Sequence, residues 1–494
     1  NYNTIVVPNC RTMRKTTFER LEQFREAGGR LIFMGSVPTH VDALPSDKVK
    51  CLARQCQVIP FKRVALLQAL EPERMVEVRL RRGELSNNLI HQLREDNGSK
   101  WLFLCHVNRK HNRVDKPEIY QIKIKGRYNP KIYDTITGEI TSCPAEIMGN
   151  DTIIMREMYA EDSLLLYLEA GVPSVKPNKS SSSFNRIIKL QDPVDFTLSE
   201  PNVLLLDRAE YSFNRGEFQP AEEILRIDNM FRQRLGYPSR MDRMAQPWTI
   251  KGPQPADHLL TLRYTIMSEI KAGGVKLAVE RPNKARIFFN GQSVNTAADG
   301  YFVDKCIKTV PLPDIIAGKN ELIIEIPFGP KTNVEWCYLL GDFGVRVRGS
   351  HTCIEKPPQQ LAFGDWVVQG LPFYAGNVTY KCLLTVEKAI PNAVLEIPHF
   401  SAPVIAVSLN GKRKGVIAYA PHRLALGNIS VGTHMLKITV YGNRFNVFGT
   451  LHNADDEFKW YGPDSYRTTG SQWTDSYLLK KMGILSNPII GEYK

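Results

Sequence analysis

The sequence predicts a mainly β protein, in which two related antiparallel β-sandwich modules follow an α/β domain and a small β-sandwich. Three observations carry this prediction: a motif that occurs twice in the second half, short alternating strands in the middle, and strand–helix alternation at the start. We expect domains over residues 1–72, 73–171, 201–355 and 356–494, with a linker over 172–200.

The repeated motif is an apolar strand that ends in Asn-Gly and is followed by a strand with a Gly-x-x-x-Leu start. The first copy, within residues 284–326, contains RIFFNGQSV and GKNELIIEI; the second, within 404–440, contains IAVSLNGKRKGV and GTHMLKITV. Asn-Gly between alternating strands is a strong hairpin signal, because both central turn residues need positive φ. We therefore predict equivalent hairpins at Asn290 and Asn410.

The sequences that flank the motif also repeat. Trp248 precedes the strand HLLTLRYTI, Trp366 precedes VTYKCLLTV, and the segments FGPKTNV and YGNRFNV follow the last shared strand of each copy. Repetition of a whole strand series indicates two related modules, near residues 245–349 and 363–483.

This pattern resembles the galactose-binding-like jelly rolls that accompany the catalytic barrels of many glycoside hydrolases. Two further segments, YLLGDFGV from Tyr338 and NVFGTLHN from Asn446, resemble parts of large α-L-rhamnosidase-like proteins. The resemblance implies a C-terminal accessory region with carbohydrate-binding and scaffolding functions. It also implies a catalytic barrel upstream of this chain and an oligosaccharide or polysaccharide as partner.

The start of the chain alternates strand and helix. The segments NTIVVP, TTFERLEQFREAGG and RLIFMG predict a strand, a helix that starts at Thr16 or Thr17, and a second strand. A helix, a strand and another helix are expected before Leu70, which predicts a parallel sheet with right-handed crossovers. This region resembles the later part of a flavodoxin-like domain. Since such a sheet has about five strands, we expect the missing strands upstream, in a longer protein.

The middle of the chain consists of short strands with turns, from Met75 to Ala170. The segment EIYQIKIKG alternates with period two, which is typical of a half-buried sheet strand. These strands predict the small β-sandwich, and the Pro- and Ser-rich VPSVKPNKSSSS then predicts the linker. After it, PAEEILRIDNMFRQRLGYP predicts a helix from Pro220 to Gly236 that packs across the first jelly roll.

Catalytic residues cannot be assigned within this sequence. A glycosidase barrel needs about 250 residues of βα repeats, but that alternation stops near Leu70. Four acidic residues form the best alternative within the chain: Asp207, Glu210, Glu222 and Glu223. We interpret them as structural: Asp207 and Glu210 lie near a strand end, and Glu222 and Glu223 suit the first turn of a helix, where acidic residues are favoured. If the resemblance holds, the catalytic carboxylates lie upstream of residue 1.

The segment FKWYGPDSYRTTGSQW is the strongest candidate for sugar binding. It combines aromatic planes with polar donors and acceptors, which suits the apolar faces and hydroxyl rim of a sugar. The candidate carbohydrate-binding residues are Trp460, Tyr461, Asp464, Tyr466, Arg467 and Trp473. The segment either lines a sugar site or docks on the upstream barrel. The alternative is that Trp473 and Tyr477 are core residues of the last strand.

Calcium is the one cofactor that the sequence suggests. Asp455, Asp456 and Glu457 form a candidate metal site, although a solvated acidic turn explains the same residues. Glu335 and Asp342 are candidates for a salt bridge or for calcium ligation. The nine cysteines have no spacing typical of zinc and are interpreted as free thiols.

Charge and hydropathy restrict the partners and the location. The net charge of +13 is spread along the chain without a nucleic-acid recognition motif, so no nucleic acid is expected. No run of about 18 apolar residues indicates a membrane span, and the first residues do not resemble a secretory signal. With free thiols, this predicts a cytoplasmic protein. Two alternatives stay open: a stand-alone, non-catalytic carbohydrate-binding protein, or a structural module that mediates homo-oligomer contacts.

Overall fold

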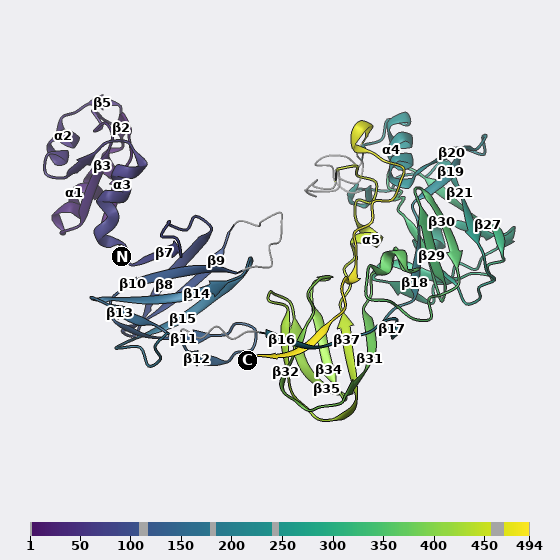
Figure 1. Ribbon diagram of the computed structural model, residues 1–494. Coiled ribbons are helices and arrows are strands. Elements are labelled where there is room, and N and C mark those ends of the chain that lie inside the picture. Colours follow the sequence, from purple (N-terminus) through teal and green to yellow (C-terminus); the bar gives the residue numbers. More distant parts are fainter. Residues whose placement is uncertain (1, 108–116, 178–183, 240–246, 456–468, 494) are drawn as a thin grey trace. The chain divides into compact units, whose positions relative to one another are not determined.

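The computed structural model describes residues 2–107, 117–177, 184–239, 247–455 and 469–493. The chain forms two compact units, Asn1–Ser180 and Ser181–Lys494, and both are built mainly from antiparallel sheets (Figure 1). Within the described ranges, none of the helices has the length and apolar character needed to cross a membrane.

The first unit begins with the α/β domain that the sequence predicts. Its elements are β1 (Thr4–Val7), β2 (Thr12–Met13), α1 (Lys15–Glu26), β3 (Arg30–Met34), β4 (His40–Val41), β5 (Leu44–Pro45), α2 (Lys48–Ala53), β6 (Gln57–Ile59), α3 (Arg63–Leu70) and the 3₁₀ turn η1 (Glu71–Glu73). The strands β1, β3 and β6 pair in parallel, as expected. Helix α1 starts slightly earlier than predicted, at Lys15.

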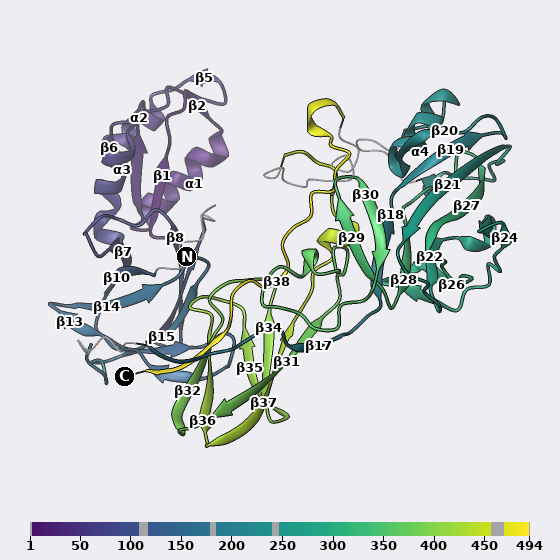
Figure 2. The same ribbon diagram turned by 45° about the vertical axis from the view of Figure 1, so that its right-hand side comes forward.

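Alternation along β3 explains why helices cover both faces of this sheet. Leu31 and Phe33 pack in one cluster with Phe18 of α1, whereas Ile32 packs in another with Ala69 of α3. Because successive strand residues point to opposite faces, one apolar strand needs a helix on each side. Figure 1 shows α1 and α3 on opposite sides of β3, and Figure 2 shows them on opposite sides of the neighbouring strand β1.

A small β-sandwich completes the first unit. Its strands are β7 (Val76–Leu80), β8 (Leu89–Asp96), β9 (Ser99–His106), β10 (Glu118–Lys125), β11 (Tyr128–Tyr133), β12 (Ile140–Ser142), β13 (Glu146–Met148), β14 (Asp151–Met158) and β15 (Ser163–Ala170). They form sheets in the orders β13-β14-β10-β7 and β12-β11-β15-β9-β8. The alternation predicted for β10 is confirmed, because Tyr120, Ile122 and Ile124 are buried while Lys123 and Lys125 are exposed.

The second unit contains two jelly-roll modules. The strands of the first are β18 (Asn202–Leu206), β19 (Arg208–Phe213), β20 (Gln219–Glu223), β21 (His258–Ser268), β22 (Lys276–Glu280), β23 (Arg286–Phe289), β24 (Gln292–Ser293), β25 (Gly300–Phe302), β26 (Asp304–Pro311), β27 (Gly318–Phe328), β28 (Cys337–Gly341), β29 (Gly344–Arg348) and β30 (His351–Glu355). One sheet has the order β18-β28-β22-β26-β25 and the other β20-β19-β21-β27-β23-β24, with β29 and β30 attached. Short 3₁₀ turns are η2 (Pro247–Thr249) and η3 (Pro282–Lys284).

The second jelly roll contains η4 (Trp366–Val368), β31 (Val378–Val386), β32 (Ile390–Glu396), β33 (Phe400–Ser401), β34 (Ile405–Leu409), β35 (Lys412–Ile417), β36 (Arg423–Ile429), β37 (Gly432–Val440), α5 (Phe445–Phe448), η6 (Gly470–Gln472), β38 (Gly483–Ile484) and β39 (Ile489–Tyr493). Together with two earlier strands, β16 (Phe184–Lys189) and β17 (Asp195–Leu198), these strands form the main sheets β16-β39-β32-β36 and β17-β31-β37-β34-β35. Figure 2 shows β31, β34, β35 and β37 side by side in this module.

Two strands of the second jelly roll come from the range that the sequence assigned to a linker. Within residues 172–200, β16 (Phe184–Lys189) pairs with β39, and β17 (Asp195–Leu198) pairs with β31. The chain therefore starts the second jelly roll, builds the whole first jelly roll, and returns to finish the second. The partners of β16 lie about 300 residues later in the sequence, so local patterning could not identify them.

The predicted hairpins are confirmed in both modules. Asn290 and Asn410 have φ of 48° and 51°, and the glycines that follow them also have positive φ. Each Asn side chain also binds the third strand: Asn290 Oδ1 accepts from Glu321 N at 2.8 Å, and Asn410 Oδ1 accepts from Met435 N at 2.9 Å. The same residue thus closes the turn and fixes the register of the next strand in each copy.

The helix of the first jelly roll, α4 (Ile224–Arg234), starts later than predicted. Pro220 lies in β20, and the helix begins only after Glu223, whose carboxylate caps it by accepting from the amides of Leu225 and Arg226. Ile227 and Phe231 are buried in the core of the first jelly roll, as the packing prediction required.

Replacing Asn410 should weaken the hairpin of the second jelly roll. In Asn410→Ala the positive φ is retained without the side chain that favours it, and the amide of Met435 loses its acceptor, so the local unfolding free energy should fall by about 1–2 kcal/mol. Hydrogen exchange of the β34 and β35 amides measures this loss. Lys412→Ala, an exposed change in the same hairpin, is the control and should stay within about 0.5 kcal/mol of the wild type; equal effects would contradict this role of Asn410.

Candidate functional site

Most of the sequence-predicted sugar and metal residues lie outside the described residues. This applies to Trp460, Tyr461, Asp464, Tyr466, Arg467, Asp456 and Glu457. Of the candidates, the structure describes Asp455 and Trp473. Asp455 is exposed, and its backbone N–H donates to Asn453 Oδ1 at 3.2 Å. Over the ranges that the structure describes, His, Cys, Asp and Glu side chains form no group of three suited to a metal ion.

Trp473 is held by neighbours from both jelly rolls. Its ring stacks on that of His452, with centroids 4.8 Å apart, and the guanidinium carbon of Arg226 lies 4.3 Å from its centroid. The indole N–H donates to Asp475 Oδ1 at 3.3 Å. A cation beside an aromatic face is a favourable contact. Neither Trp473 nor Tyr477 lies in a strand, so their assignment to a last strand is wrong, but Tyr477 does pack against the hydrophobic core of the first jelly roll.

The two sides of the aromatic segment are hydrogen-bonded to each other. Ala454 N donates to the carbonyl of Gln472 at 2.9 Å, and Thr474 N donates to the carbonyl of His452 at 2.9 Å. The residues before position 455 and after position 472 therefore run together. This pairing brings His452 next to Trp473.

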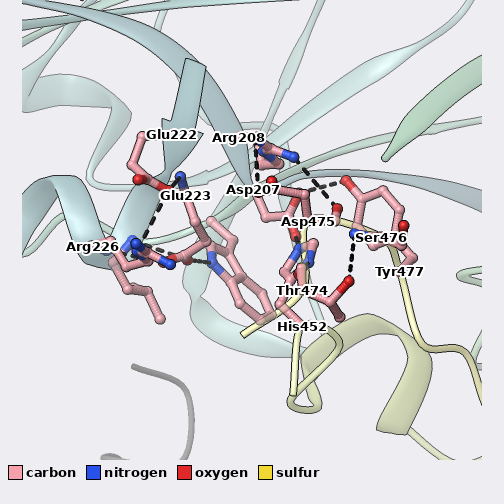
Figure 3. Close-up of polar contacts among 12 residues, drawn as sticks. Asp207, Arg208, Glu222, Glu223, Arg226, His452, Thr474, Asp475, Ser476 and Tyr477 are labelled. Atoms are coloured by element: carbon pink, nitrogen blue, oxygen red, sulfur yellow. Dashed lines mark hydrogen bonds and ion pairs between the residues drawn. The ribbon is translucent and has the colours of Figure 1, made fainter. Parts of the chain in front are cut away.

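A buried ionic cluster fixes that placement (Figure 3). Asp207, between β18 and β19, is fully buried. Its Oδ1 accepts from the hydroxyl of Tyr477 at 2.6 Å, and its Oδ2 lies 2.9 Å from Nε2 of His452. These partners are 270 and 245 residues away in the sequence. The cluster therefore joins the C-terminal segment to the first jelly roll.

The hydrogen bonds of His452 define its protonation. Nδ1 lies 2.9 Å from the carbonyl oxygen of Thr474, which can only accept, so Nδ1 carries a proton. Nε2 faces the carboxylate of Asp207, and a proton must lie in that contact as well. Burial lowers the pKa of His452, but the hydrogen bond and the charge of Asp207 outweigh it, and the net result is a pKa above the ordinary 6.5.

Glu223 is the second buried carboxylate of the cluster. Its Oε1 accepts from Leu225 N at 3.0 Å and from the indole Nε1 of Trp336 at 2.5 Å, and its Oε2 accepts from Arg226 N at 2.9 Å. Burial raises the pKa of Glu223 to about 7, against the opposite effect of these donors. The carboxylate thus fixes the start of α4 and, through it, the position of Arg226 beside Trp473.

The acidic residues of this region all have partners within the chain. Arg263 binds Glu210 at 2.8 Å, and Arg226 lies 3.5 Å from Glu222. Both oxygens of Asp207 and of Glu223 are occupied by donors, as described above. In this state the cluster positions backbone and side chains and does not present a carboxylate to a substrate.

Sequence reasoning identified Trp473 but not the role of His452. The only signal for His452 was its place in the segment NVFGTLHN, because a single histidine carries no pattern of its own. Arg226 and Arg208 were missed as well, and Arg208 binds Asp475 at 3.2 Å. These contacts depend on elements that are far apart in the sequence.

Removing the histidine should destabilise the second unit. His452→Ala leaves the buried carboxylate of Asp207 with Tyr477 alone, and breaking a buried pair from one side costs about 3–5 kcal/mol. Denaturant unfolding of the full chain, with near-ultraviolet circular dichroism of the aromatic residues, measures the loss. His351→Ala, at an exposed position on β30, is the matched control; a similar small effect of both changes would contradict the role of the cluster.

The cluster should also make stability depend on pH. Folding raises the pKa of Glu223 from 4.5 to about 7 and that of His452 above 6.5, so the folded state binds more protons. Their contributions to folding stability are complete below the ordinary pKa values. These contributions are lost as the pH rises through the pKa values of the folded state. We expect the melting temperature to fall from pH 5 to pH 8, with a smaller fall in His452→Gln above pH 6.5; identical pH profiles would contradict this assignment.

Comparison with known proteins gives only a weak relation of fold. No family model matches the chain, and no curated protein matches it. Among solved structures it aligns with a rhamnosidase from Novosphingobium sp. PP1Y, at 11% identity and a TM-score of 0.46, over 98% of this chain and 33% of that one. The α-L-rhamnosidase of Streptomyces avermitilis aligns at 10% identity and a TM-score of 0.21, over 85% and 40%. A GH2 beta-galacturonidase from Eisenbergiella tayi aligns at 10% identity and a TM-score of 0.17, over 57% and 40%. These neighbours are glycoside hydrolases, and the chain spans about a third of the first one's length.

Proposed function

We propose that this chain is the C-terminal accessory region of an α-L-rhamnosidase-like glycoside hydrolase, with carbohydrate-binding and scaffolding functions. The observation that carries the proposal is the anchoring of the aromatic segment: its two sides pair with each other and are fixed to the first jelly roll through His452, Trp473 and Tyr477. Fixing both ends of a binding segment in advance reduces the conformational entropy that the segment loses when it binds a ligand.

The chemistry of the segment supports a carbohydrate as ligand. Its sequence places Trp460, Tyr461 and Tyr466 close to Asp464 and Arg467. Aromatic faces pack on the C–H faces of a sugar ring, while carboxylate and guanidinium groups accept from and donate to its hydroxyls. We propose rhamnose-containing oligosaccharides or polysaccharides as the ligand class.

The catalytic step is assigned to a part of the protein outside this chain. Glycoside hydrolysis uses two carboxylates about 5–9.5 Å apart across a sugar ring. The carboxylates of Asp207, Glu210, Glu222 and Glu223 are engaged by neighbouring groups, which argues against that use. In this proposal the two jelly rolls and the flavodoxin-like domain support an upstream catalytic barrel.

Loss of the aromatic segment's side chains should weaken sugar binding without unfolding the chain. In Trp460→Ala/Arg467→Ala, removal of one aromatic face and one charged donor should reduce the affinity for rhamno-oligosaccharides at least tenfold, which corresponds to about 1.4 kcal/mol. Isothermal titration calorimetry measures the affinity. Tyr419→Ala removes another exposed aromatic residue of the second jelly roll and should bind like the wild type.

Two results would contradict the proposal. Unchanged affinity in the double variant would remove the aromatic segment as the site. Release of sugar from a nitrophenyl rhamnoside by this chain alone would place catalysis within it and overturn the accessory assignment.

A further inference from the structure

A cleft of about 710 Å³ lies within the second unit, and its lining includes none of Asp207, Glu223, His452 and Tyr477 of the ionic cluster. One side comes from the end of β17 and the connection to β18, including Thr197 and Glu200; the other comes from the first jelly roll, including Lys276, Tyr301 and Asp342. Its volume is within the range of small-ligand sites in proteins. Because β17 belongs to a sheet of the second jelly roll, both modules contribute to the lining.

Tyr301 is placed in this cleft by a distorted edge strand. It lies on β25, at the edge of its sheet, and the pairing with β26 shifts register between Tyr301 and Phe302. Phe302 is buried, whereas Tyr301 is 56% exposed. The next residue, Val303, has a φ of 59°, which is rare for a β-branched side chain and costs about 1–3 kcal/mol. The backbone is thus strained where a large aromatic ring is exposed.

Two of the charged groups that line the cleft, Lys276 and Glu200, are held in place. Lys276 Nζ lies 2.7 Å from Asp299 Oδ2, and the other oxygen of Asp299 accepts from Thr309 at 2.7 Å. An ammonium group has three donors, so Lys276 retains capacity for a ligand. Arg444 binds both oxygens of Glu200, at 2.5 and 2.7 Å. Fixed donors and acceptors give orientation at a low entropic cost.

The balance of charge selects the kind of ligand. Lys276 is compensated by Asp299, and Glu200 is compensated by Arg444, so the exposed Asp342 leaves the lining with an excess of negative charge. An anionic ligand such as a uronate would be repelled. A neutral ring with one apolar face and several hydroxyls matches an exposed aromatic ring beside fixed polar groups.

We propose that this cleft is a second carbohydrate subsite, which binds a neutral pyranose unit with Tyr301 against the sugar face and with Lys276 and Asp342 as hydrogen-bonding partners. It rests on the proposed carbohydrate-binding function but uses a different set of residues.

Saturation-transfer NMR and calorimetric titration of the full chain with L-rhamnose, D-galactose and rhamno-oligosaccharides test this site. Tyr301→Ala should lower the affinity for at least one neutral probe about tenfold. Tyr419→Ala is the control for loss of an exposed tyrosine and should bind as the wild type does. Methyl α-D-galacturonate should bind more weakly than D-galactose, and Asp342→Asn should reduce that difference.

The outcomes separate this inference from the proposed function. A loss of affinity in Tyr301→Ala, alone or together with a loss in Trp460→Ala/Arg467→Ala, supports the cleft. A loss only in the double variant overturns the cleft and leaves the proposed function standing. Equal or tighter binding of the uronate overturns the charge argument and with it the cleft as proposed. No binding of any probe by the wild type overturns both.

Discussion

The buried contact of Asp207 with His452 and Tyr477 is the interaction on which the arrangement of the second unit depends. A carboxylate without solvent must be paired, since an unpaired buried charge is costly. Its two partners come from the C-terminal segment, so the segment is fixed to the first jelly roll wherever the pair forms. Trp473 then stacks on the ring of His452, and Arg226 lies against the ring of Trp473.

The topology of the jelly rolls adds a second constraint. The first module is inserted between β17 and β31 of the second, so two connections join them instead of one. The short connection from Ser199 to Pro201 passes directly from one module to the other, and Glu200 within it is held by Arg444. The cleft lies at this connection. Because the first jelly roll is inserted into the second, the connection between them lines a cleft.

The two modules share a turn but differ at the positions that carry chemistry. Each Asn-Gly hairpin uses the asparagine side chain to hold the following strand, and its amide meets Asn320 in the first module and His434 in the second. The buried carboxylates Asp207 and Glu223 belong to the first module. The Asn-Gly turn is therefore common to both modules, whereas the ionic cluster depends on residues outside this turn.

The sequence by itself determined the elements whose signals are local. Positive φ in Asn-Gly turns, period-two alternation in β10 and strand–helix alternation before Leu70 depend on neighbouring residues, and the structure has each of them. Tertiary structure alone decided the sheet to which β16 and β17 belong, the start of α4 after Glu223, and the meeting of Asp207 with His452. In the last case the partners lie 245 residues apart, and no local rule of backbone conformation acts over that distance.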